Sequence, residues 1–125
     1  IKEVDPTLLI KLFNSARSDM NDIITEIFKS KLIIVGSPTI NKGILHSVAA
    51  IIEMIKGLSF KNKKAVGFGT YGWSGESVKI INEELKEAGF EVLNEGIKAL
   101  WYPDENSLQE CIDFGKDISE GLNKN

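Results

Sequence analysis

One run of six residues, 31–36, limits the possible folds of this chain more than any other feature. It reads Lys-Leu-Ile-Ile-Val-Gly, contains no turn residue before its last position, and is rich in β-branched side chains. Such a run is typical of a strand that helices cover on both faces, as in the parallel sheet of an α/β protein. The sequence therefore predicts a strand in the interior of a parallel sheet.

Amphipathic helices are predicted around this strand. Ser18 and Asp19 can cap a helix whose apolar residues recur at helical spacing. A second apolar stripe covers residues 45–55 and is expected to stop at Gly57, and a third helix is expected over residues 74–88. A final helix is expected to direct six residues toward the sheet: Leu108, Cys111, Ile112, Gly115, Ile118 and Leu122.

Three further strands are predicted from short apolar runs. Residues 8–13 lie between Pro6 and a turn signal, and residues 64–69 form a second run. Residues 90–93 and 97–101 form a last strand that is interrupted at its centre. A strand followed by a helix, repeated four times, predicts an α/β fold with an open parallel sheet of four visible strands, helices on both faces and three layers.

Length and charge restrict the function. The 125 residues suit one domain, and the net charge of -3 from well-mixed charges gives no footprint for nucleic acid. The apolar runs are too short to cross a membrane, so a cytoplasmic location is expected. His46 and Cys111 are the single histidine and cysteine, too few for a zinc or iron cluster, and Cys111 is expected to be a buried packing thiol.

Two loops follow buried strands and carry the candidate chemistry. In parallel sheets, ligands bind beyond the carboxyl ends of the strands, where residues 37–43 and 69–76 are expected. Gly72 and Gly75 allow a ligand to approach the backbone, while Tyr71 and Trp73 offer flat faces that stack on a conjugated ring. The alternative is that the aromatic residues only cover the edge of the sheet. The pair of loops favours a planar aromatic ligand.

These loops resemble those of a known family. Gly36-Ser37-Pro38-Thr39 with Asn41 nearby, followed by Gly69-Thr70-Tyr71-Gly72-Trp73-Ser74-Gly75-Glu76, resembles the flavodoxin domain of flavo-diiron proteins. The resemblance covers essentially the whole chain. It includes Arg17-Ser18-Asp19 before the first helix and Tyr102-Pro103-Asp104 after the last strand.

The resemblance implies that the chain binds FMN. The first loop would lie along the pyrimidine and N5 side of the isoalloxazine, the second would hold its other edge, and Trp101 would add a further wall. A backbone carbonyl in the segment 41–43 would face N5. If Lys42 lies near the flavin, its charge would favour the reduced anion; the alternative is an exposed loop lysine without this role. The implied cofactor-binding residues are Ser37, Pro38, Thr39, Ile40, Asn41, Gly43, Thr70, Tyr71, Gly72, Trp73, Gly75 and Trp101.

The resemblance also implies partners. FMN would accept electrons from a reductase or a rubredoxin-like donor and pass them to a diiron centre in a preceding domain. That domain reduces oxygen or nitric oxide and is commonly assembled as a head-to-tail dimer. Because its histidine and carboxylate ligands are absent here, no reductase activity is expected from this chain alone.

The chain departs from the family pattern at its start. A flavodoxin domain begins with a strand and a Ser/Thr/Gly-rich loop whose helix holds the FMN phosphate, and neither is present. We therefore expect residues 1–125 to be an N-terminally incomplete flavodoxin-like domain. The competing hypothesis is a degenerate interaction domain that no longer binds flavin. A phospho-receiver is disfavoured because the run at 8–13 ends in Phe13-Asn14, without paired acidic residues.

Overall fold

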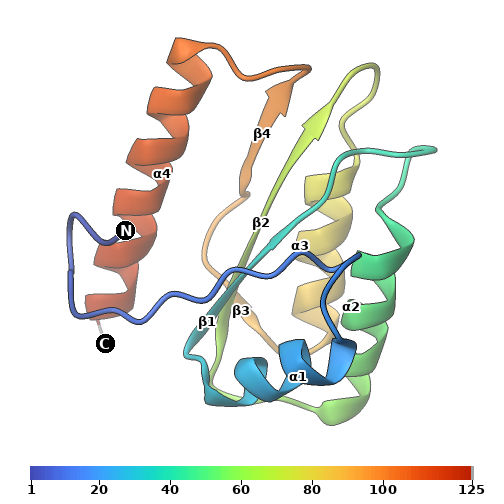
Figure 1. Cartoon of the computed structure of the whole chain (residues 1–125), viewed down its shortest axis with the longest axis vertical. Helices are drawn as coiled ribbons and strands as arrows, with labels where there is room; N and C mark the ends of the chain where they lie inside the picture. The colour runs from blue at the N-terminus through green and yellow to red at the C-terminus, as the bar shows by residue number, and fades with distance from the viewer. Residues whose placement is uncertain (125) are drawn as a thin grey trace.

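The computed structural model describes residues 1–124, which form a parallel sheet with helices on both faces (Figure 1). The elements in chain order are α1 (Met20–Lys29), β1 (Leu32–Gly36), α2 (His46–Leu58), β2 (Lys64–Tyr71), α3 (Ser77–Glu87), β3 (Glu91–Val92), β4 (Ile97–Leu100) and α4 (Glu105–Asn123). The expected α/β fold with a four-stranded parallel sheet is confirmed.

Strand β2 is the centre of the sheet. On one side it pairs with β1 over its first five residues, from Leu32↔Lys64 to Gly36↔Phe68. On the other side it pairs first with β3 and then with β4, all in parallel. The interrupted last strand of the prediction thus appears as β3 and β4, both beside β2.

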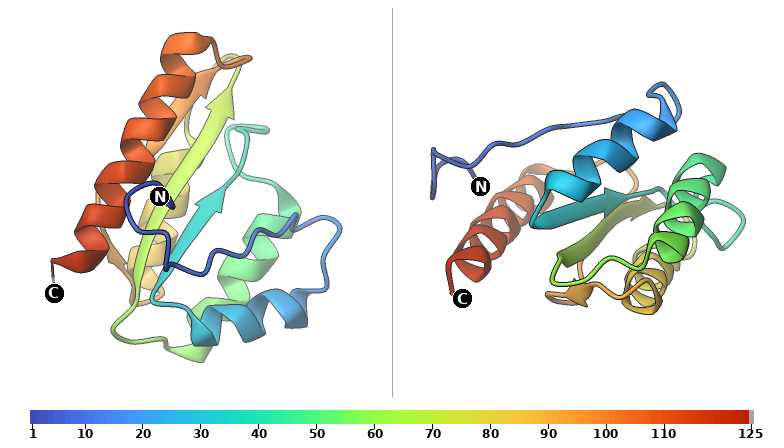
Figure 2. Two further views of the ribbon diagram at one scale, coloured as in Figure 1. Left: turned by 60° about the vertical axis from the view of Figure 1, so that its left-hand side comes forward. Right: turned by 90° about the horizontal axis from the view of Figure 1, so that it is seen from below.

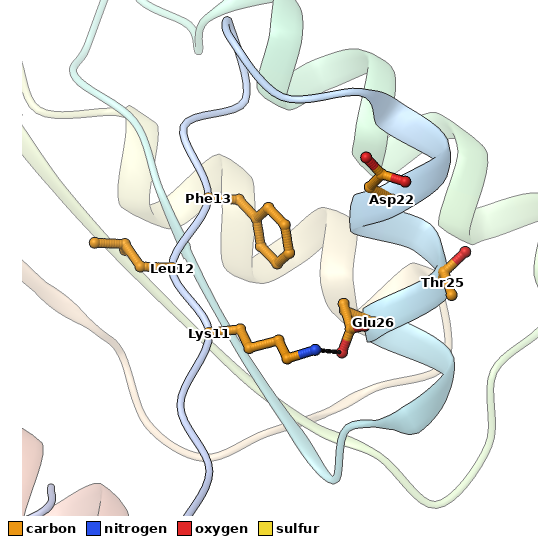
Figure 3. A pocket seen from close by; sticks show the side chains of 6 residues that line it. All are labelled: Lys11, Leu12, Phe13, Asp22, Thr25 and Glu26. Atoms are coloured by element: carbon orange, nitrogen blue, oxygen red, sulfur yellow. Dashed lines mark ion pairs between the residues drawn. The ribbon is translucent and has the colours of Figure 1, made fainter.

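The strand predicted over residues 8–13 is wrong. This segment is extended but pairs with no strand in the described residues, and Leu9 and Leu12 are 84% and 94% exposed. Figure 3 shows Lys11 and Phe13 directed toward α1 and Leu12 directed away from it, as in the alternation of an extended chain. An apolar run becomes a strand only when a neighbour satisfies its backbone, and this segment has none within residues 1–124.

The main core lies on one face of the sheet. Figure 2 shows α1, α2 and α3 on this face and α4 on the other. The buried side chains of this core include Ile27 from α1, Ile52 and Ile55 from α2, and Ile81 and Leu85 from α3. The helical stripes predicted for these three helices therefore do meet the sheet.

In helix α4, two predictions are wrong: the inward direction of several apolar residues and the burial of Cys111. Of its predicted inward residues, Ile118 is 2% exposed, but Leu108 and Ile112 are 53% and 47% exposed, and Cys111 is exposed as well. The helix is anchored near its carboxyl end, where Lys64 Nζ donates to the Gly121 carbonyl over 3.0 Å. Cys111, in the amino-terminal half of the helix, lines a shallow hollow together with residues 1–3, so it is not the expected buried packing thiol.

Two helix boundaries differ from the predictions. Helix α2 continues through Gly57 to Leu58 and ends at Ser59, which adopts the left-handed conformation with φ 52°. Helix α3 begins at Ser77, three residues after the predicted start. Residues 74–76 instead remain part of the loop that follows β2.

Candidate functional site

The first loop continues the sheet beyond β1. Ser37 N donates to the Phe68 carbonyl over 3.2 Å, and Thr39 N donates to the Thr70 carbonyl over 2.8 Å. Residues 37–39 therefore run beside the carboxyl end of β2. The first loop and the start of the second lie next to each other, as the parallel sheet predicts.

Two hydroxyl groups of this loop cap the helices that follow. Helices α2 and α3 receive no capping bond from their own N-cap side chains. Instead, Ser37 Oγ accepts from Leu45 N over 2.9 Å, and Thr39 Oγ1 accepts from Ser77 N over 3.3 Å. Ser37 is buried and Thr39 half-buried. The Ser-x-Thr spacing thus supplies amide partners that the helix starts otherwise lack.

The tip of the first loop is a tight hairpin turn. Ile40 N donates to the Gly43 carbonyl over 3.2 Å, and Gly43 N donates back to the Ile40 carbonyl over 2.8 Å. The two residues between them, Asn41 and Lys42, have φ values of 50° and 59°. Positive φ at both central positions is the signature of a type I′ turn, which Asn adopts readily and Lys does not.

The second and third loops meet at Tyr71. Its carbonyl accepts from Trp101 N over 2.7 Å. The Trp101 indole lies against Gly72, where an added Cβ would be 3.1 Å from the ring. Trp101 itself has φ 52°, a strained value for a bulky residue. This backbone conformation places an indole across the start of the second loop, so a side chain at position 72 would press against the ring.

The aromatic side chains here are largely uncovered. Trp73 is 97% exposed, Trp101 71% and Tyr102 92%, all at the carboxyl edge of the sheet. In the same region, Glu76 Oε2 is buried without a hydrogen-bond partner in the described residues. The site thus combines apolar faces open to solvent with a buried acceptor that residues 1–124 leave unsatisfied.

The structure brings most of the predicted site residues to one edge. Thr39, Thr70, Tyr71, Gly72 and Trp101 are joined by the contacts above. Ser37 lies behind them, 3% exposed, with its hydroxyl already bonded. Pro38, Ile40, Asn41 and Trp73 are exposed on the two loops, and Gly43 and Gly75 are half-buried.

Two residues at the candidate site, Ser77 and Lys98, were not predicted from the sequence. Ser77 Oγ accepts from Thr39 Oγ1 over 3.0 Å, which joins the first loop to the start of α3. Lys98 Nζ lies 5.4 Å from the centroid of the Tyr71 ring. The charge of Lys98 in an otherwise apolar last strand was the available sequence signal.

Comparison with known proteins places this arrangement in a family. The model of the flavodoxin family matches residues 4–115. The chain belongs to the flavodoxin family. Among curated relatives of this flavodoxin chain, the anaerobic nitric oxide reductase flavorubredoxins of Klebsiella pneumoniae and Salmonella arizonae are each 44% identical over 119 residues. The match covers 95% of this chain but 24% and 25% of those proteins.

Solved structures agree with the flavodoxin assignment. The rubredoxin oxygen:oxidoreductase of Desulfovibrio gigas superposes with a TM-score of 0.89 at 34% identity, over 95% of this chain and 30% of that one. A flavodoxin from the domain Archaea superposes with a TM-score of 0.76 at 28% identity, over 87% of this chain and 74% of that one. This flavodoxin chain thus resembles both a free flavodoxin and one part of larger redox proteins.

Within residues 1–124 the structure shows neither a metal-binding cluster nor a membrane-spanning helix. No group of three or more His, Cys, Asp and Glu side chains there is placed to hold a metal ion. None of the helices described in that range combines the length and apolar character needed to cross a bilayer. A hollow of about 480 Å³ does lie between residues 11–13 and α1 (Figure 3), but none of its lining residues belongs to the loops that carry the candidate chemistry.

Proposed function

We propose that this chain binds the isoalloxazine ring of FMN between its first and second loops and serves as an electron-transfer domain. The observation that carries the proposal is Trp73, which is 97% exposed on a glycine-rich loop at the carboxyl edge of a parallel sheet. A fully exposed indole contributes nothing to the core, so a ligand that stacks on it accounts for its presence better than packing does.

The ring portion of FMN fits the residues present. Trp73 and Trp101 supply uncovered apolar faces, and the hairpin turn at Asn41 and Lys42 supplies backbone polar groups at the opposite loop. Glu76 Oε2 is an acceptor that lacks a donor within residues 1–124. When bound, FMN supplies one- and two-electron chemistry, while the chain orients the ring, excludes water from one face and sets the charge around it.

The phosphate portion does not fit the described residues. Helix N-termini are the usual phosphate sites of parallel α/β folds. Here Ser37 already occupies the amide of Leu45 at α2, and Thr39 that of Ser77 at α3. At α4 the capping group is the carboxylate of Asp104, which accepts from Ser107 N. We therefore propose that the described site holds the flavin ring and that the phosphate contacts lie outside residues 1–124.

The open edge of β1 supports an N-terminally incomplete domain, as we proposed from the sequence. β1 pairs with β2 alone among the described strands, and Ile34 at its middle is 39% exposed. Residues 8–13 are extended and unpaired, with Leu9 and Leu12 exposed. We propose that a further strand pairs between β1 and residues 8–13, and that the loop after it binds the phosphate.

The relatives suggest partners for this carrier role. Their names include a flavorubredoxin and a rubredoxin oxygen:oxidoreductase, and this chain spans about a quarter of the flavorubredoxins. We propose a rubredoxin-like donor, a diiron domain as acceptor, a cytoplasmic location and a head-to-tail homodimer in the intact protein. No oxygen or nitric oxide reduction is expected from residues 1–125 alone.

A titration of the chain with riboflavin and with FMN tests the proposal. The ring site predicts saturable quenching of flavin fluorescence by both ligands with similar affinity, because neither ligand finds a phosphate contact in this chain. Trp73→Ala is expected to weaken both about five- to tenfold, the loss of about 1 kcal/mol of stacking. Leu12→Ala, which removes a 94% exposed apolar side chain from the segment 8–13, is the control.

The absence of flavin binding would support the second candidate function, an interaction domain. If neither ligand quenches, and Trp73→Ala behaves as the unchanged chain does, the flavin proposal fails for these residues. The open apolar edge of β1 would then favour a flavodoxin-like interaction domain that does not bind flavin.

A further inference from the structure

Lys98 reaches from β4 into the second loop. Its Nζ donates to the Gly75 carbonyl over 3.4 Å and lies 5.4 Å from the centroid of the Tyr71 ring. A Cβ added at Gly75 would lie 3.1 Å from Lys98 Nζ and 3.4 Å from Tyr71 Cγ. The absence of a side chain at Gly75 therefore leaves the space in which the lysine contacts the loop.

This contact is the main polar tether of the loop. Among the hydrogen bonds of the described residues, the one from Lys98 is the one that reaches residues 72–75. Before this segment, Tyr71 is fixed by its register with Leu100, and after it α3 begins at Ser77. Trp73 lies between these fixed points with its side chain free in solvent. Lys98 thus provides the side-chain hydrogen bond, and the Trp101 indole the packing contact at Gly72, that hold the segment around Trp73.

Lys98 also brings an uncompensated charge to the loop. Its ammonium group makes no ion pair with a carboxylate in the part of the chain that the structure describes. Glu76 lies in the same loop without bonding to it. A positive charge within about 10 Å of a ligand anion changes its affinity several-fold at an effective dielectric constant of about 20 to 40.

We propose that Lys98 is a positioning residue for the flavin ring and the charge that favours its reduced form, an inference that rests on the proposed function. Reduction adds two electrons and one proton to the neutral ring and leaves it with one negative charge. The electrons come from a one-electron donor protein, or from dithionite in an assay. A cation held on the second loop stabilises this anion relative to the neutral oxidised ring and so raises the midpoint potential.

Lys98→Met tests the proposal because it keeps the length of the stem and removes the charge and the donor. Lys98→Arg is the conservative variant, and Lys86→Met, on the exposed face of α3, is the matched control. Riboflavin affinity is measured with the ligand oxidised and with it reduced by dithionite. Lys98→Met is expected to weaken the oxidised complex about threefold and the reduced complex about tenfold. The threefold difference corresponds to a potential about 14 mV more negative.

The tether has a readout that needs no flavin. In the flavin-free chain, Lys98→Met is expected to lower the ¹⁵N order parameters of Gly72 to Gly75, while Lys98→Arg and Lys86→Met leave them unchanged. Unchanged order parameters overturn the positioning role. An equal loss of affinity for both flavin states, or no loss, overturns the charge role while leaving the flavin site in place. A wild-type chain that binds no riboflavin overturns the charge role together with the proposed function.

Discussion

At the scale of single residues, the hydroxyl groups of Ser37 and Thr39 in the first loop have a structural role. Ser37 Oγ accepts from Leu45 N and donates to the Pro38 carbonyl, so its hydrogen bonds are made within the loop. Thr39 Oγ1 likewise accepts from Ser77 N and donates to Ser77 Oγ at the start of α3. These residues hold the loop in shape, and any ring that binds there meets mainly its backbone and the exposed side chains beside it.

Ser37→Ala is expected to lower the free energy of unfolding by about 1 to 2 kcal/mol, because it leaves the amide of Leu45 unsatisfied at the start of α2. The measurement is urea denaturation followed by circular dichroism. Ser18→Ala removes a hydroxyl that makes no hydrogen bond within residues 1–124 and is expected to change the value by less than about 0.5 kcal/mol. Equal losses in the two variants would show that the cap has no energetic role.

At the scale of elements, one buried amide explains why the last strand is broken. Asn82 Oδ1 accepts from Gly67 N over 2.8 Å, and Asn82 Nδ2 donates to the Glu95 carbonyl over 2.8 Å. The side chain thus replaces the ladder between β2 and the segment that separates β3 from β4. Gly96, with φ 83°, completes the turn, since a Cβ there would lie 2.3 Å from the Gly67 carbonyl oxygen.

Asn82→Leu tests this explanation, because leucine fills a similar volume but neither accepts nor donates. It is expected to lower the free energy of unfolding by about 2 to 3 kcal/mol, the penalty of a buried unpaired amide at Gly67 together with the lost bond to Glu95. Asn106→Leu, at an exposed position of α4, is the matched control with a change below about 0.5 kcal/mol. A stability equal to that of the control would contradict the account.

The start of α4 gives a pH dependence. The backbone hydrogen bond from Ser107, followed by its side-chain bond, lowers the pKa of Asp104 below its ordinary value of 3.8. Because the folded pKa is the lower one, this carboxylate contributes stability that is complete above pH 3.8 and is lost as the pH falls through the folded pKa.

Asp104→Asn keeps a capping oxygen but does not titrate. The unmodified chain is therefore expected to lose more stability than this variant as the pH falls from 5 to below 3.8. The measurement is the midpoint of urea unfolding at each pH. Parallel pH profiles for the two proteins would show that the cap does not depend on the charge.

At the scale of the whole molecule, β2 organises both the sheet and the site. It pairs with β1, β3 and β4, and at its carboxyl end the carbonyls of Phe68, Thr70 and Tyr71 accept hydrogen bonds from the first and third loops. At its other end, Lys64 bonds to the end of α4 on the opposite face. The loops that carry the candidate chemistry are therefore fixed by one strand.

Local sequence patterns correctly predicted the features that depend on residues close together in the sequence. Asp19 does cap α1, accepting from Asn21 N over 2.7 Å, and the apolar spacing of α1 does bury Ile23 and Ile27. Contacts between residues far apart in the sequence could not be predicted in this way. The run at 8–13 has the composition of a strand, but composition does not supply a pairing neighbour. Cys111 has the spacing of a core residue but is exposed on α4. Lys98 and Ser77 act across loops far apart in sequence.

The most direct test of the flavin-ring site is a ¹H–¹⁵N correlation titration of the chain with FMN. The account predicts saturable shifts of the backbone amides in residues 37–43, 70–76 and 101–102, with residues far from these loops unaffected. The absence of saturable shifts would contradict it. So would shifts centred on residues 11–13 and α1, because the ligand would then occupy the hollow of Figure 3 instead of the loops.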